Sequence, residues 1–571
     1  MNVLLPGVAA LVAVLIVPGW SFYFDVVPKV VILLAGAALA LWLWPRQARS
    51  TSLTWFFAML AAQALAILLA TIFSTHPWFS IYGSTWRRSG APAELAVLVL
   101  AAATAAMLAG DRANLRLWLR ITVLAAVPIS IYAIMQYFGI DPILATSAYH
   151  FGEGKYMIVR PPGTLGHASY LATYLLYAAF GGGALARMEV GRLWKTAALG
   201  SAGLALFAMV LSGTRAALLG LVAGALFIAV REHLDRRWLV AAAGIVMVVA
   251  AFYISPAGAR LRARVFWSSE DMLGGSRLLL WRDTLRMSAS RWLTGYGPES
   301  FSLEFPRHES IELARQYPDF YHESPHNVFL DALVSKGLLG LAALIGVSIF
   351  GIATARGAVG GAFVAILISQ QFTAFIIPTE LYFYLCIAML VSNTKPLPSL
   401  RKLPIAMGRV LAVPFACFAI FLTTGDLLLG SARRALDRGD VESAAQLVDR
   451  AGDWHASADF YFSRRFLQEK AAAPAMQAAV NAAKTADDPQ NALVNLAAFR
   501  ATVDDAAGVE KNLRDAVSAA PNWYKPHWLL AQVLEKEGRM TEAAAEAQAA
   551  FNRDGGKNPE VTATRDRLSS R

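Results

Sequence analysis

The feature that most constrains this chain is a succession of apolar runs over its first 424 residues. A helix needs about 20 mostly apolar residues to cross the hydrocarbon core of a bilayer, and nearly every run approaches that length. The runs at 215–230 and 380–393 are short, so we expect about 12–13 membrane spans. The runs lie at 3–20, 27–44, 53–73, 92–109, 118–138, 168–186, 195–213, 215–230, 238–255, 328–352, 358–376, 380–393 and 406–424.

Composition supports the same interpretation. Hydrophobic residues make up 56% of the chain and charged residues 16%, whereas soluble domains carry about 25% charge. The shortage of charge is confined to the apolar part, because the sequence beyond Gly425 is rich in Ala, Asp, Arg and Glu. We therefore predict an all-α protein with a polytopic transmembrane bundle at 1–425 and a soluble helical domain at 426–571. Cys386 and Cys417 fall inside apolar runs, which excludes a disulfide framework.

Basic residues in alternate loops predict the orientation, because cytoplasmic loops of membrane proteins are enriched in Lys and Arg. No basic segment precedes the first apolar run, so we read that run as a span and not as a removed signal. The pattern places the N-terminus in the cytoplasm and the tail outside. It also accounts for the net charge of +11 without nucleic acid as a partner. The loop cations are Arg46, Arg49, Arg112, Arg116, Arg120, Arg187, Arg192, Lys195, Arg231, Arg236, Arg237, Arg356, Lys395, Arg401, Lys402 and Arg409.

Arginines on the predicted outer side are not explained by orientation alone. Many fall in a long outer loop at 256–327, between spans 9 and 10, and long loops translocate whatever their charge. Arg215 differs, because LSGTRAALLG is a tight junction between two apolar runs, where an arginine costs about 2.5–3.5 kcal/mol near the bilayer centre. We expect Arg215 to line a cavity instead of snorkelling to the interface. The outer arginines are Arg87, Arg88, Arg160, Arg215, Arg260, Arg262, Arg264, Arg277, Arg282, Arg286 and Arg291.

The outer loop contains a segment, GGSRLLLWRDTLRM, that predicts an amphipathic helix. Its basic band comprises Arg277, Arg282 and Arg286, with leucines on the other side. A helix that merely lies on the membrane surface has the same pattern. Arginine suits phosphate, because its planar guanidinium makes bidentate hydrogen bonds. No Gly-rich phosphate loop or metal-ligand cluster is evident, so we predict a site for a lipid-linked diphosphate without metal or cofactor.

His326 lies where the outer loop re-enters the membrane, at the same depth as several outer arginines. We expect it to act in catalysis or in acceptor binding, with His322 and Glu323 as competing candidates. Asn327 follows directly and is placed to cap the next helix.

Five segments occur in an order that is typical of one family: IYAIMQYFGID, TLGHASYLATYL, LSGTRAALLG, WLTGYGPESF and HNVFLDALVSKGLLGL. Through them the chain resembles the O-antigen ligase and polymerase superfamily over about 70–400. The resemblance implies an enzyme of the bacterial inner membrane that transfers a glycan from undecaprenyl diphosphate to an acceptor on the outer face. Relatives often have Asn where this chain has His167, so we carry no role onto that position.

The resemblance also implies roles for single residues. Arg215 and Arg277 would hold the donor diphosphate, and His326 would activate the acceptor hydroxyl. Attack of that hydroxyl on the anomeric carbon would invert its configuration without a metal. Further candidates are Arg88 and Arg160 for the diphosphate, and Glu299 and Asn327 for orienting the acceptor. For Glu299, in the GPES turn, a helix-capping role is favoured.

The soluble tail carries a repeat pattern. Its segment PNWYKPHWLLAQVLEKEGRMTEAAAEAQAAF has Trp, Ala and Gly at spacings that resemble a tetratricopeptide repeat. Small residues at these positions let paired helices pack closely. The tail is therefore interpreted either as a docking surface for a protein or glycan, or as a helical cap on the outer loops.

Three classes of function stay open from the residues. A glycan transferase would perform lipid A–core ligation, polymerisation of repeat units or O-glycosylation of a protein. A transporter is the second, because intramembrane charges also mark ion pathways; Asp331 and Glu380 are the main acidic residues in the runs. A membrane-anchored scaffold is the third. The transferase is favoured, since transport does not explain the basic outer loop and an anchor needs far fewer spans.

Overall fold

The computed structural model describes residues 1–44, 50–151, 158–232, 250–263, 275–318, 320–392, 405–452 and 458–570, with residues 244 and 247. These residues are almost entirely helical, apart from one antiparallel pair of short strands, β1 (His150–Phe151) and β2 (Ile158–Val159). The predicted all-α fold is confirmed.

Every apolar run in the described residues forms a helix, and the run at 238–255 lies mostly outside them. Six helices are long and apolar enough to cross a membrane, namely α3, α5, α6, α8, α15 and α18. Shorter apolar helices include α1, α2, α16 and α17, so the fold is that of a multi-pass membrane protein. The helices of this bundle are α1 (Leu4–Val14), α2 (Val27–Trp42), α3 (Thr51–Ile72), α5 (Ala91–Leu108), α6 (Arg112–Tyr137), α7 (Ala168–Met188), α8 (Arg192–Leu211), α9 (Arg215–Glu232), α15 (Val328–Thr354), α16 (Gly357–Ser369), α17 (Ile377–Ser392) and α18 (Ile405–Asp437).

Some predicted loop cations lie outside the described residues, and so does the outer arginine Arg264. The loop cations concerned are Arg46, Arg49, Arg236, Arg237, Lys395, Arg401 and Lys402.

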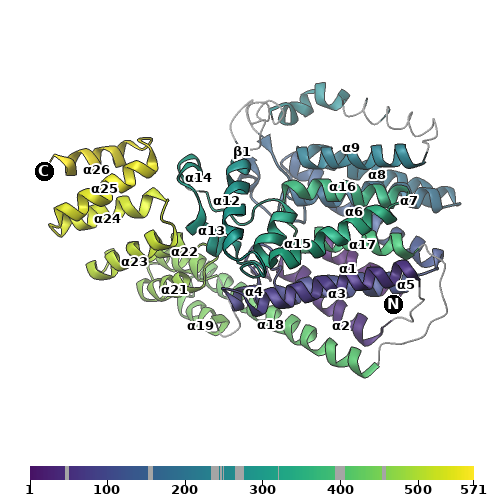
Figure 1. Cartoon of the computed structure of the whole chain (residues 1–571), viewed down its shortest axis with the longest axis horizontal. Coiled ribbons are helices and arrows are strands. Elements are labelled where there is room, and N and C mark those ends of the chain that lie inside the picture. The colour runs from purple at the N-terminus through teal and green to yellow at the C-terminus, as the bar shows by residue number, and fades with distance from the viewer. Residues whose placement is uncertain are drawn as a thin grey trace.

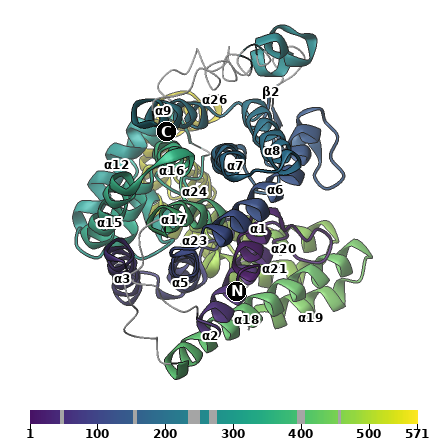
Figure 2. The ribbon, with the colours of Figure 1, turned by 90° about the vertical axis from the view of Figure 1, so that its right-hand side faces the viewer.

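The helix α17 lies at the centre of the bundle, although its apolar run is short. All of its residues are buried, and it packs against α1, α5, α7 and α16 (Figure 2). Its neighbours cover it on every side, so it needs no lipid-facing surface of its own.

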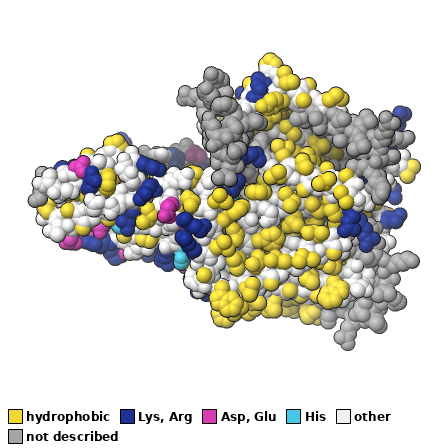
Figure 3. Space-filling view, turned by 45° about the horizontal axis from the view of Figure 1, so that its top comes forward, with side chains coloured by type: hydrophobic (Ala, Val, Ile, Leu, Met, Phe, Trp, Pro, Cys, Tyr) yellow, Lys and Arg dark blue, Asp and Glu magenta, His cyan; other side chains and the backbone are white. Residues whose placement is uncertain are grey.

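Peripheral helices present wide apolar faces. Exposed leucines and valines run along α9, including Leu219, Val222 and Leu226, and comparable side chains are exposed on α3 and α18. Figure 3 shows one such hydrophobic face over the bundle, with Lys and Arg side chains toward its two ends. An apolar surface of this extent is unusual for a soluble protein and fits a lipid environment.

The C-terminal tail extends from one end of the bundle (Figure 1), which we call the tail-bearing end. Successive tail helices pack on each other, and small side chains such as Ala444, Ala479 and Ala547 are fully buried between them. The predicted boundary at 425/426 falls inside α18, which continues without a break into the tail. The tail helices are α19 (Val441–Gly452), α20 (Asp459–Gln468), α21 (Ala472–Thr485), α22 (Pro489–Ala501), α23 (Ala506–Ala519), α24 (Tyr524–Lys536), α25 (Met540–Asp554) and α26 (Pro559–Ser569).

The loop between the bundle and α15 folds over the tail-bearing end. The predicted amphipathic helix is present as α12, which packs on α15 and buries Leu280 but leaves Leu285 exposed. The short elements at this end of the protein are η1 (Thr146–Ala148), η3 (Pro256–Gly258), α4 (Pro77–Tyr82), α12 (Arg277–Ser290), α13 (Phe301–His308), α14 (Ile311–Gln316) and η4 (Gln370–Phe372).

A break inside α15 locks this loop in place. Gly337 adopts φ +62°, which an L-residue with a side chain rarely adopts. The break leaves the carbonyls of Val334 and Ser335 without helical partners, and they accept hydrogen bonds from Tyr296 and Gly297, each at 2.9 Å. The WLTGYGPESF and HNVFLDALVSKGLLGL segments therefore interlock through their backbones.

Candidate active site

Several helices begin together at the tail-bearing end. They are α5, α7, α9, α15 and α17, and each directs its N-terminal backbone N–H groups toward this end of the bundle. The partial positive charge at a helix N-terminus favours bound anions. The five sequence segments singled out above all contribute residues here.

The IYAIMQYFGID and TLGHASYLATYL segments support each other. The side-chain amide of Gln136 accepts from the backbone N–H of Gly163 at 2.8 Å and donates to Asp141 at 2.8 Å. His167 caps α7, with its Nδ1 accepting from the N–H of Ser169. These hydrogen bonds hold the loop that precedes α7 in place at the tail-bearing end of the bundle.

A cavity of about 450 Å³, which we call the main cavity, lies beside this loop. Its wall includes apolar groups and also several charged or polar side chains that approach from four segments of the chain. The polar lining residues are Tyr23, Asp25, Lys29, Thr85, Trp86, Arg87, His167, Tyr170 and Glu323. A smaller cavity of about 260 Å³ shares Asp25, Gly166 and His167 with it, and Arg160 lines this side cavity.

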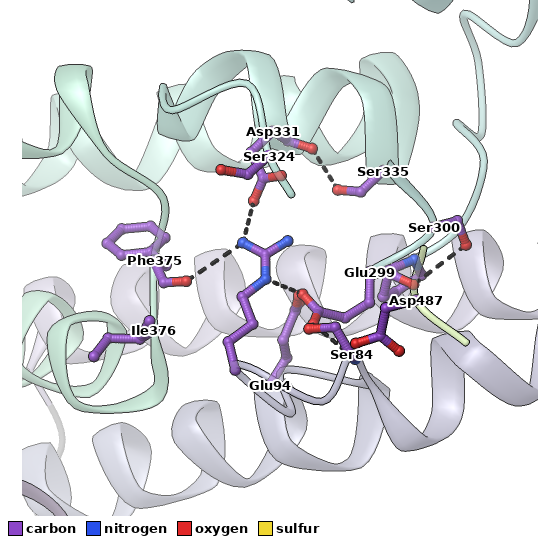
Figure 4. A network of polar contacts seen from close by, with 12 residues as sticks. Ser84, Glu94, Glu299, Ser300, Ser324, Asp331, Ser335, Phe375, Ile376 and Asp487 are labelled. Atoms are coloured by element: carbon purple, nitrogen blue, oxygen red, sulfur yellow. Dashed lines mark hydrogen bonds and ion pairs between the residues drawn. The ribbon is translucent and has the colours of Figure 1, made fainter. Parts of the chain in front are cut away.

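Arg87 is a buried cation of the site and pairs with two carboxylates. Its guanidinium forms an ion pair with Glu299 and a second one with Asp331 at 3.2 Å, and it also donates to the carbonyl of Phe375 (Figure 4). Only 4% of its side chain is exposed. Breaking such a buried pair is costly because it leaves uncompensated charge, so Arg87 ties the loop after α4 to α15.

Three residues at this site have backbone strain. Arg88, Glu299 and His326 adopt φ angles of +52°, +63° and +51°, in the left-handed region that residues with side chains rarely occupy. Strain of this kind costs about 1–3 kcal/mol per residue and tends to occur at functional sites. Three strained residues at the tail-bearing end of the bundle support a functional role for this end.

A second set of contacts brings Arg277 and His326 together. Arg277 donates to the carbonyl of Phe372 at 3.3 Å, and Trp281 donates to the carbonyl of Pro325 at 2.9 Å. Pro325 directly precedes His326, and Trp281 packs against Phe372. The α12 helix thus fixes both η4 and the turn that carries the histidine.

Asn327 caps α15 as predicted. Its side-chain oxygen accepts from the N–H groups of Phe329 and Leu330, at 3.0 and 3.1 Å. Its amide nitrogen donates to the carbonyl of Gln371, which joins the start of α15 to η4. The adjacent Gln370 is fully buried, and neither polar atom of its side chain has a hydrogen-bond partner among the described residues.

The environment shifts the pKa values of His326 and Glu323, the two ionisable groups of this turn, in opposite directions. Burial, followed by the positive charges of Arg277 and Arg87, lowers the pKa of His326 to about 4. Burial raises the pKa of Glu323 to about 7, although Arg87 acts in the opposite direction. At neutral pH the imidazole of His326 is therefore uncharged, while Glu323 is close to its titration midpoint.

The other predicted diphosphate ligands lie at different distances from the main cavity. Arg215 is half-buried at the start of α9, where Thr214 bonds the carbonyl of Ala168 at the start of α7. Arg160 is 3.4 Å from the hydroxyl of Ser169. Arg88 is buried over the ring of Tyr23 and does not line either cavity, whereas its neighbour Arg87 does.

The favoured capping role of Glu299 is wrong. The residue precedes α13, but its carboxylate binds Arg87 and accepts from the N–H of Ser84 at 3.0 Å. The competing candidate His322 packs between Phe305 and Phe320 of the outer loop and does not line the main cavity.

Some polar residues of this region were not selected from the sequence. Lys29 lies in an apolar run near the start of α2, and Glu94 lies in the apolar run of α5, where it forms an ion pair with Lys336 at 2.9 Å. The charges themselves, placed inside otherwise apolar runs, were the available signal. Among the described residues, no group of three or more His, Cys, Asp or Glu side chains is arranged to hold a metal ion.

Residues 200–345 match the family model described as O-antigen ligase. The matched range contains the last part of α8, the helices α9 and α12 and the first part of α15, and so includes Arg215, Arg277 and His326. A search of curated proteins gives no match. The match contains three of the five sequence segments, LSGTRAALLG, WLTGYGPESF and HNVFLDALVSKGLLGL, and supports the predicted resemblance over this range. It also supports glycan transfer of the ligase or polymerase type.

Proposed function

Because residues 200–345 carry the O-antigen ligase family region, we propose that the protein transfers a saccharide from undecaprenyl diphosphate to an acceptor hydroxyl. The reaction takes place on the outer face of the bacterial inner membrane, which the tail-bearing end faces. The N-terminus is then cytoplasmic and the tail periplasmic. Ligation to lipid A–core is the favoured reaction, and polymerisation or protein O-glycosylation would use the same donor chemistry.

Arg277 and Arg215 bind the donor diphosphate in this proposal. Both lie where α7, α9 and η4 meet, beside helix N-termini that favour an anion. A guanidinium gives a diphosphate two parallel hydrogen bonds and stabilises the charge that develops on it as it leaves. Arg87, already neutralised by two carboxylates, holds the cavity wall against the start of α15, the helix that follows His326.

His326 takes the proton of the acceptor. The acceptor oxygen forms a bond to the anomeric carbon, and the bond from that carbon to the diphosphate oxygen breaks with its electron pair on the diphosphate. The hydroxyl proton passes to the neutral imidazole. The configuration at the anomeric carbon is inverted, since attack and departure occur on opposite faces.

One observation carries this proposal: a neutral histidine, on a strained turn, lies close enough to Arg277 for that charge to lower its pKa. A base and an anion-binding cation held close to each other are what transfer from a diphosphate needs. The diphosphate is already a good leaving group, so no further activation of the donor is required.

The test uses a strain that lacks the gene and is complemented with variants, with surface glycan scored on a gel. We expect His326→Ala and Arg277→Ala to abolish the glycan lost in the deletion strain. Arg286→Ala, on the exposed side of the same α12 helix, should restore it.

Equal amounts of each variant in the membrane fraction control for folding. Normal glycan in both His326→Ala and Arg277→Ala would overturn the assigned site. The banding that disappears in the deletion strain distinguishes the reactions: loss of all capped lipid A–core indicates ligation, and shortening to single repeat units indicates polymerisation.

A further inference from the structure

A third hollow lies outside the main and side cavities, where the tail meets the bundle. It has a volume of about 530 Å³ and is open on one side, and we call it the outer cleft. One wall is α4 and the residues before it, and the other is formed by the tail at the ends of α19 and α21. Its lining includes His76, Trp78, Tyr82, Lys484 and Thr485.

The bundle wall of the cleft presents a flat aromatic surface. The rings of Trp78 and Tyr82 stack with centroids 6.1 Å apart and planes 14° from parallel. Trp78 is 72% exposed, which leaves its indole ring available. Tyr82 is backed by Phe418 and Phe421 of α18, whose rings are also nearly parallel to it. The platform is therefore supported from behind and open in front.

The remaining lining is polar and well anchored. His76 bonds Glu304 at 2.9 Å, and Ser74 and Thr75 both bond the carbonyl of Tyr296, so this wall is held to the loop above α15. On the tail wall Lys484 is exposed and forms no ion pair or hydrogen bond within the described part of the chain. Imidazole and ammonium donors beside an aromatic face suit a ligand that has hydroxyl groups and flat C–H faces.

The outer cleft adjoins the main cavity through two short segments. Tyr82 lines the cleft and Thr85 lines the cavity, three positions further along the chain. On the tail side Ala486 lines the cleft, and the next residue, Asp487, accepts from the backbone N–H of Thr85 at 2.6 Å. A polymer whose reacting end occupies the cavity would extend into the cleft.

From this juxtaposition we propose that the outer cleft is a saccharide-binding subsite that holds sugar units remote from the reacting bond. This proposal rests on the proposed function, since it assigns the cleft to the chain being transferred or extended. Sugar rings stack their C–H faces on Trp78, and their hydroxyls bond His76 and Lys484. A purely membrane-anchoring role for Trp78 does not account for the polar tail wall opposite it.

The experiment measures transfer by the purified full-length protein in nanodiscs with saccharides of increasing length. The probes are undecaprenyl-diphosphate-linked glycans of one and of several repeat units, and acceptors of matching lengths. We expect Trp78→Ala to raise the KM of the long saccharide about fivefold to tenfold and to leave that of the single unit unchanged. Trp78→Phe, which keeps a ring, should restore most of the loss.

The matched control is Trp20→Ala, at an equally exposed tryptophan (70%) of the tail-bearing end that does not line the cleft. Varying donor length at fixed acceptor, and then the reverse, shows which of the two chains occupies the cleft. An effect in either series supports the subsite.

A second readout does not depend on catalysis. Oligosaccharides released by mild acid from the surface glycan of the producing strain are titrated into the protein, and saturation-transfer NMR detects binding. Wild type should bind, and Trp78→Ala should lose most of the signal. An unchanged KM for long chains, or equal losses for short and long chains, would overturn the subsite. Absence of transfer by wild type with intact oligosaccharide binding would overturn the proposed function instead.

Discussion

Both ends of the helical bundle carry arginines that form ion pairs, but the ends differ in how deeply these pairs are buried. At the end opposite the tail, Arg187 and Glu232 form an ion pair in which both side chains are about one-third exposed. At the tail-bearing end, Arg87 and Glu299 are almost completely buried. Surface pairs of the first kind contribute little to stability, whereas breaking a buried pair is costly. The difference separates surface arginines from those that build the tail-bearing end.

The largest effect that tests this contrast is on stability. Arg87→Met leaves the carboxylates of Glu299 and Asp331 buried without their cation, and we expect a loss of about 3–5 kcal/mol. Arg187→Met at the opposite end should cost less than about 1 kcal/mol. Thermal unfolding of the purified variants in detergent measures both. Similar midpoints for the two variants would remove the distinction between the ends.

The next effect is on activity. Arg277→Ala should reduce transfer about 100- to 1,000-fold, because one charge-stabilising donor to the leaving group is lost. Arg120→Ala, which breaks a bidentate pair with Glu189 at the opposite end, should change transfer by less than about threefold. Initial rates with lipid-linked donor at equal protein amounts provide the comparison. Arg277→Lys separates charge from geometry, since lysine cannot form the two parallel bonds.

A smaller effect concerns how the tail attaches. Burial raises the pKa of Asp487 to about 6, while its bonds to Thr85 act in the opposite direction. Because the pKa of Asp487 is raised in the docked state, docking of the tail is strongest at low pH and weakens as pH rises through about 6. The docking free energy changes by at most about 3 kcal/mol over this titration.

Hydrogen exchange of α21 and α22 checks this expectation at pH 5 and pH 8. Protection factors, which are the exchange rates corrected for base-catalysed intrinsic exchange, should be lower at pH 8 than at pH 5 in wild type. Asp487→Asn should remove that difference in protection, and Asp505→Asn, at a helix cap elsewhere in the tail, should leave it unchanged. Equal protection factors at the two pH values in wild type would contradict a role for Asp487 in docking.

The smallest effect is on the pH profile of transfer. With the pKa of His326 lowered to about 4, its neutral form predominates above about pH 5.5, so the rate should be nearly constant from there to pH 8. If Glu323 were the base, the rate would instead rise with pH through about 7, because its carboxylate forms only there. A rise of that kind that disappears in Glu323→Gln would transfer the role from His326 to Glu323.

The sequence predicts local features of this protein well. Apolar runs predict the helices, because a membrane span is determined by about 20 consecutive residues. Asn327 is recognisable as a helix cap from its position before an apolar run. Arg277 is recognisable as a candidate phosphate ligand because it belongs to the basic band of α12. The short run of α17 is also recognisable as a helix, but its central position follows only from the packing of its neighbours.

Long-range features were not predictable. Glu299 was assigned to a helix cap because its partner Arg87 lies more than 200 positions away. Nothing local to Gly337 indicates that its helix break accepts the backbone of Tyr296 and Gly297. The choice between Arg87 and Arg88 as a cavity residue depends on the backbone conformation at their turn, which pattern alone does not specify.

Release of undecaprenyl diphosphate by purified protein in nanodiscs, with donor and acceptor supplied, decides whether the arginines of the tail-bearing end hold the diphosphate and His326 activates the acceptor. We expect release by wild type and Arg286→Ala, and release at least about 100-fold slower by Arg277→Ala and by His326→Ala. Release at wild-type rates by both of the latter variants would contradict this assignment.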